Sequence, residues 1–195
     1  MTRTIEFNPA TARNSALVLF WRKGYQATSL ADLLDAMAIS RSSFYATFVD
    51  KRSLFLACLD LFAQRSIDMI AQSRTEMPPL EALHSFFVRN FTAPRGNRSQ
   101  WGCMLVNTVL EMADVDDELS ARASTHLDAF KAAFEGCLID AHCEPKRASD
   151  LANLLMLLNE GVRVSSRRNL PPDQITAAID TAFRLIRSDL GGNGP

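Results

Sequence analysis

The side chains best suited to binding a partner form one polar helix face between residues 41 and 48. Phe44 and Phe48 stand four residues apart, so on a helix they share one side, which is then the buried side. The other side carries an arginine and small hydroxyl groups in place of the Glu, Lys and Gln of a plain surface helix: Arg41, Ser42, Ser43 and Tyr45. Such a face suits the major groove of DNA, because small side chains allow close approach and an arginine binds guanine O6 and N7 with two hydrogen bonds.

A second short helix precedes this face, and a tight turn joins the two. Its apolar side chains recur at helical spacing: Leu30, Leu33, Leu34 and Met37. Thr28 or Ser29 can cap its start, and Ser40 can cap the start of the next helix, because their hydroxyls accept hydrogen bonds from free backbone N–H groups. The pattern predicts a helix-turn-helix. The alternative is a helical hairpin inside an ordinary all-α domain.

The same segment holds candidates for contacts with DNA phosphates. The free N–H groups of the first helix, with the Thr28 hydroxyl, form an expected phosphate site. Lys51 lies in the first turn of the following helix, where a cation opposes the helix dipole, and a phosphate contact would explain it. The residues expected to read bases are Arg41, Ser42 and Ser43. Those expected to hold phosphates are Thr28, Tyr45 and Lys51, and the caps Ser29 and Ser40 complete the DNA-binding set.

Many residues around this motif recur at fixed spacing in one known family. They are the run Ala16–Phe20, Lys23-Gly24-Tyr25, Ala27-Thr28-Ser29, Ile39-Ser40, Phe44-Tyr45, Phe48, Lys51 and Leu54. Over roughly residues 9 to 60, the chain therefore resembles the N-terminal DNA-binding domain of TetR-family transcriptional regulators. It departs from the family pattern at Ala38, which replaces the usual turn glycine at a cost of about 1 kcal/mol if its φ is positive. Ala46 and Thr47 also replace bulkier residues.

Composition and charge set limits on the class of protein. The chain has 195 residues, of which 47% are hydrophobic, enough for a sizeable core in one large or two small domains. Its net charge of −1 disfavours a nucleic-acid binder, but the charge is uneven. Residues 1–66 hold eight Lys and Arg against five Asp and Glu, a net charge of +3, whereas the remainder holds thirteen against seventeen, a net charge of −4. The basic part is thus the part with the helix-turn-helix.

Several classes of protein are not expected. No apolar run approaches the roughly 18 residues that a membrane span requires, and the four cysteines lack the dense spacing of a disulfide framework. No nucleophile, phosphate-loop or zinc-protease motif is present. We expect a cytoplasmic protein that is not an enzyme, has no cofactor and does not contact a membrane.

Helical periodicity continues to the end of the chain and predicts an all-α protein of about nine helices. Residues 1–60 form the expected helix-turn-helix domain of three helices. Residues 61–195 form the expected antiparallel helical domain for effector binding and dimerisation. A long helix from Lys51 to about Arg74 joins the two, so a tilt of this helix would move the DNA-binding part.

The last two helices are expected at about residues 145–168 and 172–190. The first of them is apolar almost all round, so it must be covered on both sides. In TetR-family proteins this pair makes an intersubunit four-helix bundle, and the resemblance implies a twofold homodimer. The alternative is a helix buried within one subunit.

The second domain is rich in aromatic and methionine side chains that could line a cavity for an apolar ligand. Residues 101–111, WGCMLVNTVLE, also resemble a Gly-Cys segment of many TetR relatives, and the resemblance implies a ligand pocket. The expected ligand-binding residues are Phe62, Phe87, Phe91, Trp101, Met104, Asn107, Thr108, Glu111, Phe130 and Asn159. The polar members of this set, or Arg163, would orient the ligand. For each side chain the alternative is an ordinary place in the core.

Cys103 is the redox candidate, because a position near a helix N-terminus favours the reactive thiolate. The alternative is a buried, inert thiol. Cys137, His142 and Cys143 invite a metal-site interpretation, but on a continuous helix the two cysteines lie about 240° apart, on different faces. No metal site is expected.

Together these patterns predict a ligand-responsive, sequence-specific transcriptional regulator, most simply a repressor that a small-molecule effector releases from its operator. A homodimer would place two recognition helices in successive major grooves, about 34 Å apart on palindromic double-stranded DNA. Three alternatives stay open: a redox- or electrophile-sensing regulator acting through Cys103, a helical ligand-binding protein or enzyme without a DNA target, and a helical adaptor.

Overall fold

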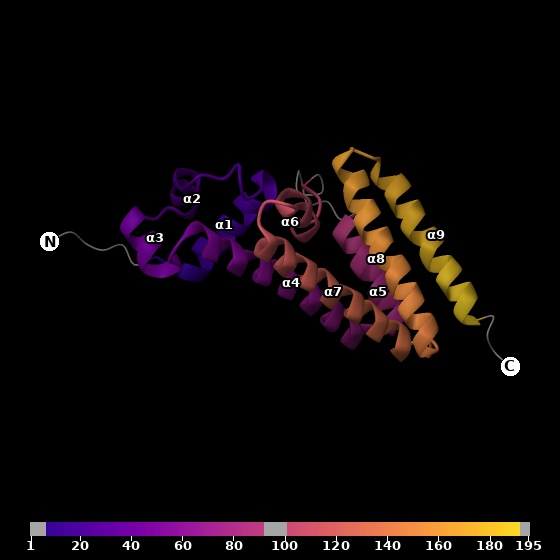
Figure 1. Ribbon diagram of the computed structural model, residues 1–195. Helices are drawn as coiled ribbons and strands as arrows, with labels where there is room; N and C mark the ends of the chain where they lie inside the picture. The colour runs from indigo at the N-terminus through magenta and orange to yellow at the C-terminus, as the bar shows by residue number, and fades with distance from the viewer. Residues whose placement is uncertain (1–6, 92–100, 192–195) are drawn as a thin grey trace.

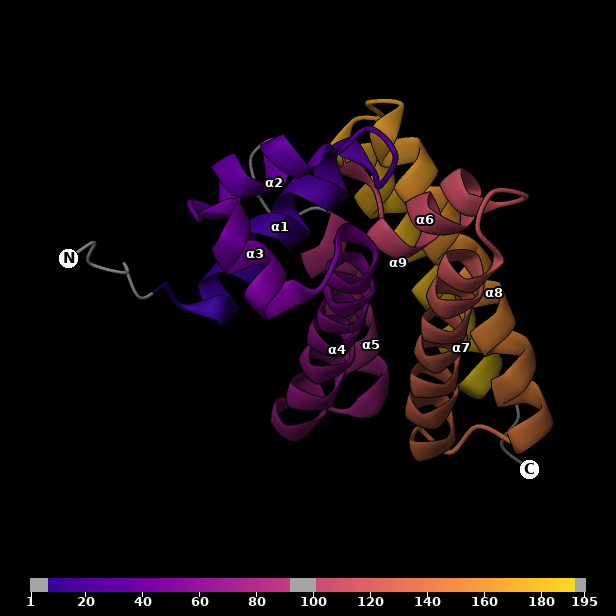
Figure 2. The same cartoon turned by 60° about the vertical axis from the view of Figure 1, so that its left-hand side comes forward.

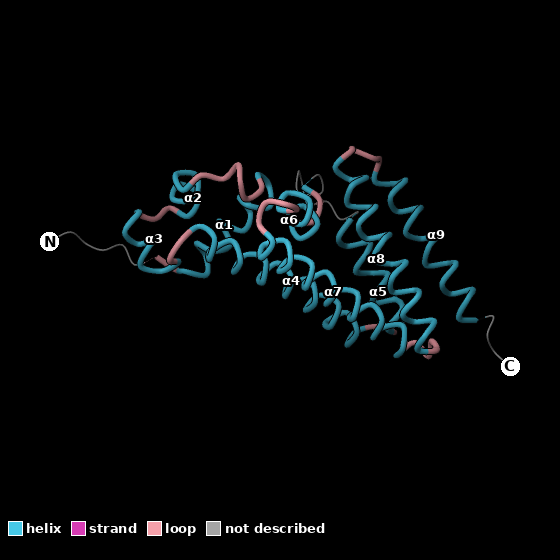
Figure 3. Tube along the Cα trace, in the orientation of Figure 1, coloured by secondary structure: helices cyan, strands magenta, loops and turns pink. Residues whose placement is uncertain are grey.

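The computed structural model describes residues 7–91 and 101–191, and these residues form nine α-helices without a strand. Figure 3 shows the helices joined by short loops. The helices are α1 (Pro9–Lys23), α2 (Leu30–Met37), α3 (Arg41–Phe48), α4 (Lys51–Glu76), α5 (Pro79–Phe91), α6 (Met104–Met112), α7 (Asp117–Asp140), α8 (Pro145–Arg167) and α9 (Pro172–Gly191). The all-α prediction of about nine helices is confirmed.

The short helices of the N-terminal head, which comprises α1, α2 and α3, begin and end at recognisable residues. Ser29 caps α2 and forms a capping box with Asp32. Ser40 caps α3 by accepting a hydrogen bond from the N–H of Ser43. Between them, α2 ends at Ala38, whose φ of 53° and ψ of 43° are left-handed. The alanine therefore takes the conformation that a turn glycine takes at lower cost.

Aromatic side chains pack the head against α4. Phe44 and Phe48 of α3 are both buried, as their spacing predicts. Phe20 of α1 meets Phe55 of α4 edge to face, with ring centroids 4.8 Å apart. Because α3 uses its two phenylalanines for this core, its opposite face stays free of the head.

The long helix α4 belongs to both halves of the molecule. It contacts α1 and α3 of the head and α5, α6 and α7 of the remainder, which we call the body. Its 26 residues give a length of about 39 Å, and Figure 1 shows it running from the head into the body. The predicted domain boundary between residues 60 and 61 falls inside this continuous helix.

The body, α5 to α9, packs around phenylalanines. Phe87 lies 5.5 Å from Phe134 of α7 and 5.4 Å from Phe183 of α9, measured between ring centroids. Figure 2 shows α4 and α5 as one antiparallel pair, with α7 and α8 beside each other. In Figure 1, α9 lies at the end of the molecule opposite to α3.

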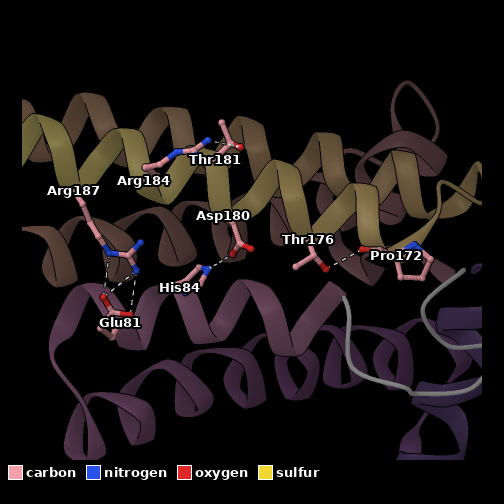
Figure 4. Close-up of polar contacts among 8 residues, drawn as sticks. All are labelled: Glu81, His84, Pro172, Thr176, Asp180, Thr181, Arg184 and Arg187. Atoms are coloured by element: carbon pink, nitrogen blue, oxygen red, sulfur yellow. Dashed lines mark hydrogen bonds and ion pairs between the residues drawn. The ribbon is translucent and has the colours of Figure 1, made fainter.

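Polar contacts along one side hold α9 on α5, as Figure 4 shows. Arg187 donates to the Glu81 carboxylate at 2.9 Å, and His84 Nε2 lies 2.8 Å from Asp180 Oδ1. Because exposed pairs of this kind add little stability, their main effect is to set the register of α9 on α5. This register leaves part of α8 and α9 facing outward.

Candidate nucleic-acid interface and ligand cavity

The outward face of α3 carries the polar side chains that the sequence predicts to read DNA. Arg41 and Ser42 are exposed, and Ser43 is half-buried. Tyr45 is 51% exposed, and its ring meets the buried Phe44 edge on, with centroids 5.4 Å apart. The packing of α3 thus presents one arginine, two serine hydroxyls and one phenol on a single open surface.

The serine hydroxyls at the start of α3 form a small cluster. The hydroxyls of Ser42 and Ser43 each lie 2.9 Å from the Ser40 hydroxyl, which also accepts from the Ser43 N–H at 3.1 Å. The hydroxyls therefore satisfy one another in the absence of a partner. A base edge or phosphate that approaches this face exchanges one set of hydrogen bonds for another, at little desolvation cost.

The structure corrects the predicted role of Thr28. Its side chain is buried and its hydroxyl donates to the Gly24 carbonyl at 2.6 Å, so the hydroxyl is not presented to a phosphate. Ser29 is the cap of α2 instead, and it shares the Asp32 carboxylate with Lys23, whose ammonium lies 2.9 Å away. Hydrogen bonds from Lys23 and Ser29 hold the pKa of Asp32 well below its usual range.

Lys51 projects from the start of α4 over the ring of Tyr25. The distance from its Nζ to the ring centroid is 4.2 Å, which is cation–π geometry. Burial lowers the pKa of Lys51, and burial raises the pKa of Tyr25. The ring therefore fixes the ammonium group beside the turn between α1 and α2.

Glu111 of α6 holds that same turn from the body side. Its carboxylate accepts hydrogen bonds from the backbone N–H groups of Tyr25 at 3.0 Å and Gln26 at 2.7 Å. Gly24 has a φ of 83°, and a Cβ there would lie 2.8 Å from the carboxylate, so only glycine fits. Glu111 is predicted to bind a ligand, but in the structure its carboxylate instead joins the body to the head.

A cavity of about 210 Å³ lies between the head and the body. Its walls come from α1, α4, α5 and α8, with one residue from the segment before α6. The lining residues are Leu17, Val18, Trp21, Phe62, Arg65, Ser66, Met69, Asn90, Phe91, Gly102, Arg163 and Ser166. Three of the predicted ligand residues are among them: Phe62, Phe91 and Arg163.

The other predicted ligand residues do not line this cavity: Phe87, Trp101, Met104, Asn107, Thr108, Glu111, Phe130 and Asn159. Phe87 and Phe130 are fully buried in the body core. The Thr108 hydroxyl donates to a backbone carbonyl of its own helix at 2.8 Å. The Asn107 amide donates to the Trp101 carbonyl at 2.8 Å and accepts from the Arg167 guanidinium at 2.9 Å. Helical periodicity predicts which side chains face inward, but it does not predict whether an inward-facing side chain packs in the core or lines a cavity.

Residues of α1 that the sequence does not mark as ligand contacts also line the cavity. Leu17 and Trp21 stand one turn apart and face it together with Val18. The indole N–H of Trp21 donates to the Gly102 carbonyl at 3.0 Å, which ties α1 to the start of α6. The cavity is therefore bounded by a helix of the head itself.

The Cys103 thiol, the redox candidate, lies inside the protein. Cys103 is fully buried and caps α6 without a side-chain hydrogen bond, so its thiol is not presented to solvent. Across residues 7–91 and 101–191, no group of three or more His, Cys, Asp and Glu side chains could hold a metal ion. None of the helices in these ranges is both long enough and apolar enough to span a membrane.

Comparison with known proteins covers both halves of the chain. Residues 13–58 match the model described as bacterial regulatory proteins of the TetR family. Residues 79–184, more than half of the chain, match the model of the C-terminal domain of LmrA/YxaF-like transcriptional regulators. The HTH-type transcriptional repressor ComR of Escherichia coli K12 is 28% identical over 189 residues, which cover 92% of this chain and 89% of ComR.

Solved structures agree with these matches. A cysteine mutant of the TetR family transcriptional regulator CifR, complexed with 26-base-pair operator DNA, is 26% identical, with a TM-score of 0.74 over 93% of this chain and 98% of CifR. SCO4454 of Streptomyces coelicolor shares the fold, with a TM-score of 0.81 at 17% identity, over 93% of this chain and 94% of its own. With its helix-turn-helix head, its shared helix α4 and these matches over both halves, the chain belongs to the TetR family of bacterial regulatory proteins.

Proposed function

We propose that this protein is a transcriptional repressor that binds a palindromic operator through α3 and releases it when a small molecule fills the cavity. The observation that carries the proposal is the free face of α3, with Arg41 and Ser42 exposed above two buried phenylalanines. Small hydroxyls and a leading arginine match the donor and acceptor pattern of the major groove. We assign Arg41, Ser42 and Ser43 to base contacts, and Ser29, Tyr45 and Lys51 to positions near the phosphates.

The protein acts as a homodimer through α8 and α9 in this proposal. Three leucines of these helices stay largely exposed in the single chain: Leu154 at 54%, Leu157 at 67% and Leu185 at 65%. Leu154 and Leu185 line one groove between the two helices, with Leu151, Leu158 and Ile186 at its base. A second copy that covers this face would form a four-helix bundle and remove the leucines from water.

The effector would act on the position of the head. The cavity is bounded both by α1 of the head and by α8 of the dimerisation face. A ligand that fits better when these helices lie farther apart favours a dimer whose α3 helices no longer match adjacent grooves. The helix α4, the Glu111 contact and the Trp21–Gly102 hydrogen bond connect the body to the head and would carry this shift.

Selection from a random duplex library by the purified protein tests the proposal without knowledge of the effector. We expect enrichment of a palindrome whose half-sites are about one helical turn apart. Binding that shows no enrichment and disappears as salt is raised would contradict the proposal, since such binding comes from phosphate contacts alone.

Two variants then distinguish the residue proposed to contact bases from the residue proposed to contact phosphates. Arg41→Ala should lose about tenfold or more of the discrimination at one base pair. Lys51→Ala should weaken binding to the enriched and the scrambled duplex alike and lower the salt slope by about one. Equal losses by both variants on both duplexes would show that this division of roles is wrong.

A further inference from the structure

A buried arginine in the cavity has no anionic partner among the residues that the structure describes. Arg163 of α8 is 5% exposed and lines the cavity. Its hydrogen bond is made by Nε, which donates to Asn159 Oδ1 at 3.3 Å, and its Cζ lies 4.8 Å from the centroid of Phe91. No Asp or Glu of the described residues forms an ion pair with it, whereas the more exposed Arg147 and Arg187 each have one.

A second buried donor next to Arg163 is also unsatisfied. Asn159 is fully buried, and its Nδ2 has no hydrogen-bond partner among the described residues, although its Oδ1 holds Arg163. In the sequence, residues 92–100 contain no Asp or Glu. The Arg163 guanidinium in the wall and the Asn159 amide beside it are costly without an acceptor, because an unpaired buried donor loses its hydration and the loss is largest for a charged one. The cation–π contact with Phe91 offsets only part of this cost.

The rest of the wall defines the other properties of a matching ligand. Its charged members are Arg163 and Arg65, and no acidic residue is among them. The hydroxyls of Ser66 and Ser166 donate to carbonyls of their own helices. Trp21, together with Phe62, Phe91 and the aliphatic side chains of α1, supplies apolar surface. The volume of about 210 Å³ exceeds the roughly 150 Å³ of an engineered cavity that binds benzene.

We propose that the cavity binds a small organic anion: a single ring or a short branched chain that bears one carboxylate, with the carboxylate on Arg163 and the body against Trp21 and Phe91. A planar carboxylate accepts two hydrogen bonds from a guanidinium fork, which neutralises the buried charge. The inference deepens the proposed function, since it names the chemical class of the effector on the assumption that this cavity is the effector site.

Calorimetric titration of the 195-residue protein tests the proposal with a panel of three carboxylates and their neutral amides. The probes are benzoate, phenylacetate and 2-methylbutanoate, each beside its primary amide. At least one carboxylate should bind about tenfold or more tightly than its amide, because a charged hydrogen bond is lost in the amide. Failure of all three carboxylates to bind, or equal binding of acid and amide, would overturn the proposal.

Variants assign the effect to Arg163. Arg163→Met should lose about tenfold or more of the carboxylate affinity while it keeps or gains affinity for the amide. Its melting temperature without ligand should change little, because removal of an unpaired buried charge offsets the loss of the hydrogen bond to Asn159 Oδ1. Arg89→Met is the matched control: Arg89 is exposed on α5 and lies outside the cavity, so this variant should bind as the unaltered protein does. Unaltered carboxylate binding by Arg163→Met, or a marked loss of its stability, would overturn the assignment.

Titration of the selected operator with and without the bound carboxylate separates this inference from the proposed function. Carboxylate binding that leaves operator affinity unchanged would preserve the anion site and contradict its role as the effector site. Specific operator binding without any carboxylate binding would preserve the repressor and contradict the anion site.

Discussion

At position 38, an alanine occupies a backbone conformation that glycine adopts at lower cost. Its φ of 53° lies in the left-handed region, where Cβ crowds the following carbonyl. We expect Ala38→Gly to raise the free energy of unfolding by up to about 1 kcal/mol, because relief of this crowding exceeds the added entropy of the unfolded chain. For a protein of this size, the melting temperature should rise by about 2 °C, which thermal unfolding followed by circular dichroism can detect.

Ala36 provides the matched control for this substitution. It is exposed on the same helix, two residues earlier, and has an ordinary helical conformation. Ala36→Gly removes the same methyl group and adds the same freedom to the unfolded chain, so it should lower stability by about 0.5–1 kcal/mol. A loss of stability in both variants would show that residue 38 is not strained.

Single residues were predictable where their neighbours are local in the chain. The spacing of Phe44 and Phe48 and the cap at Ser40 follow from helix geometry alone, and all three take their predicted places. Thr28 could not be placed in this way, because the fold of the turn decides whether its hydroxyl meets a carbonyl or solvent.

The backbone conformation of Val49 was still less predictable from local sequence. This residue has a φ of 64° and spans a one-residue turn in which the N–H of Asp50 donates to the Phe48 carbonyl at 2.7 Å, although a β-branched residue disfavours this conformation.

At the scale of elements, the contact of α6 with the head depends on the Glu111 carboxylate. Glu111→Gln replaces one acceptor oxygen with an N–H₂ group that faces a backbone donor. We expect a loss of about 1 kcal/mol of stability. Amide hydrogen exchange at Tyr25 and Gln26 should be several-fold faster, because their N–H groups lose a charged acceptor.

The exposed Glu76, near the far end of α4, provides the control for Glu111. Glu76→Gln makes the same chemical change at a side chain remote from the turn, and it should leave exchange at Tyr25 and Gln26 unaltered. If Glu111→Gln also left exchange at these two amides unaltered, the carboxylate would not be what holds the turn.

The link between α4 and α7 should weaken in acid. Hydrogen bonds from Arg52, and then from the Leu119 N–H, lower the pKa of Asp116. A lowered pKa in the folded state gives stability that is present above the usual carboxyl pKa of about 4 and is lost as the pH falls below it. Asp116→Asn should therefore lower stability at pH 7 but have much less effect at pH 3, since asparagine still caps α7. A difference in urea midpoint that does not change between these pH values would contradict this account.

Helix starts were predictable because prolines and capping residues mark them in the sequence. Contacts between helices distant in the chain were not. Glu111 lies 86 residues after Tyr25, and only the docking of α6 brings its carboxylate to that backbone. The same limit explains why α1 was assigned to the head alone, whereas Leu17 and Trp21 also form a wall of the cavity.

At the scale of the whole molecule, the exposed leucines of α8 and α9 predict the assembly. Leu185→Glu places a charge at the centre of the face that a second copy would cover, and it should convert the dimer to a monomer at micromolar concentration. Sedimentation velocity measures the change. Val115→Glu is the control, since Val115 is 63% exposed outside this face and its variant should stay dimeric. A dimeric Leu185→Glu variant would place the subunit contact elsewhere.

The overall arrangement followed from periodicity together with the family resemblance, since nine helical segments and a basic N-terminal part leave few alternatives. The location of the cavity did not follow, because it depends on how α1, α5 and α8 meet around α4. Arg163 shows the difference. From the sequence it is one of several polar side chains that could orient a ligand, but only the folded chain shows that it lacks an anionic partner among the described residues.

A spacing series on the selected operator tests the central claim, that two α3 helices read DNA at a separation fixed by the dimer. The affinity of the protein is measured for the operator and for the same half-sites with about five base pairs inserted between them, which turns one half-site to the opposite face of the duplex. The unaltered protein should lose about tenfold or more of its affinity on insertion, and the affinity of the Leu185→Glu variant should not depend on the spacing. Equal affinity of the unaltered protein for both duplexes would contradict the central claim.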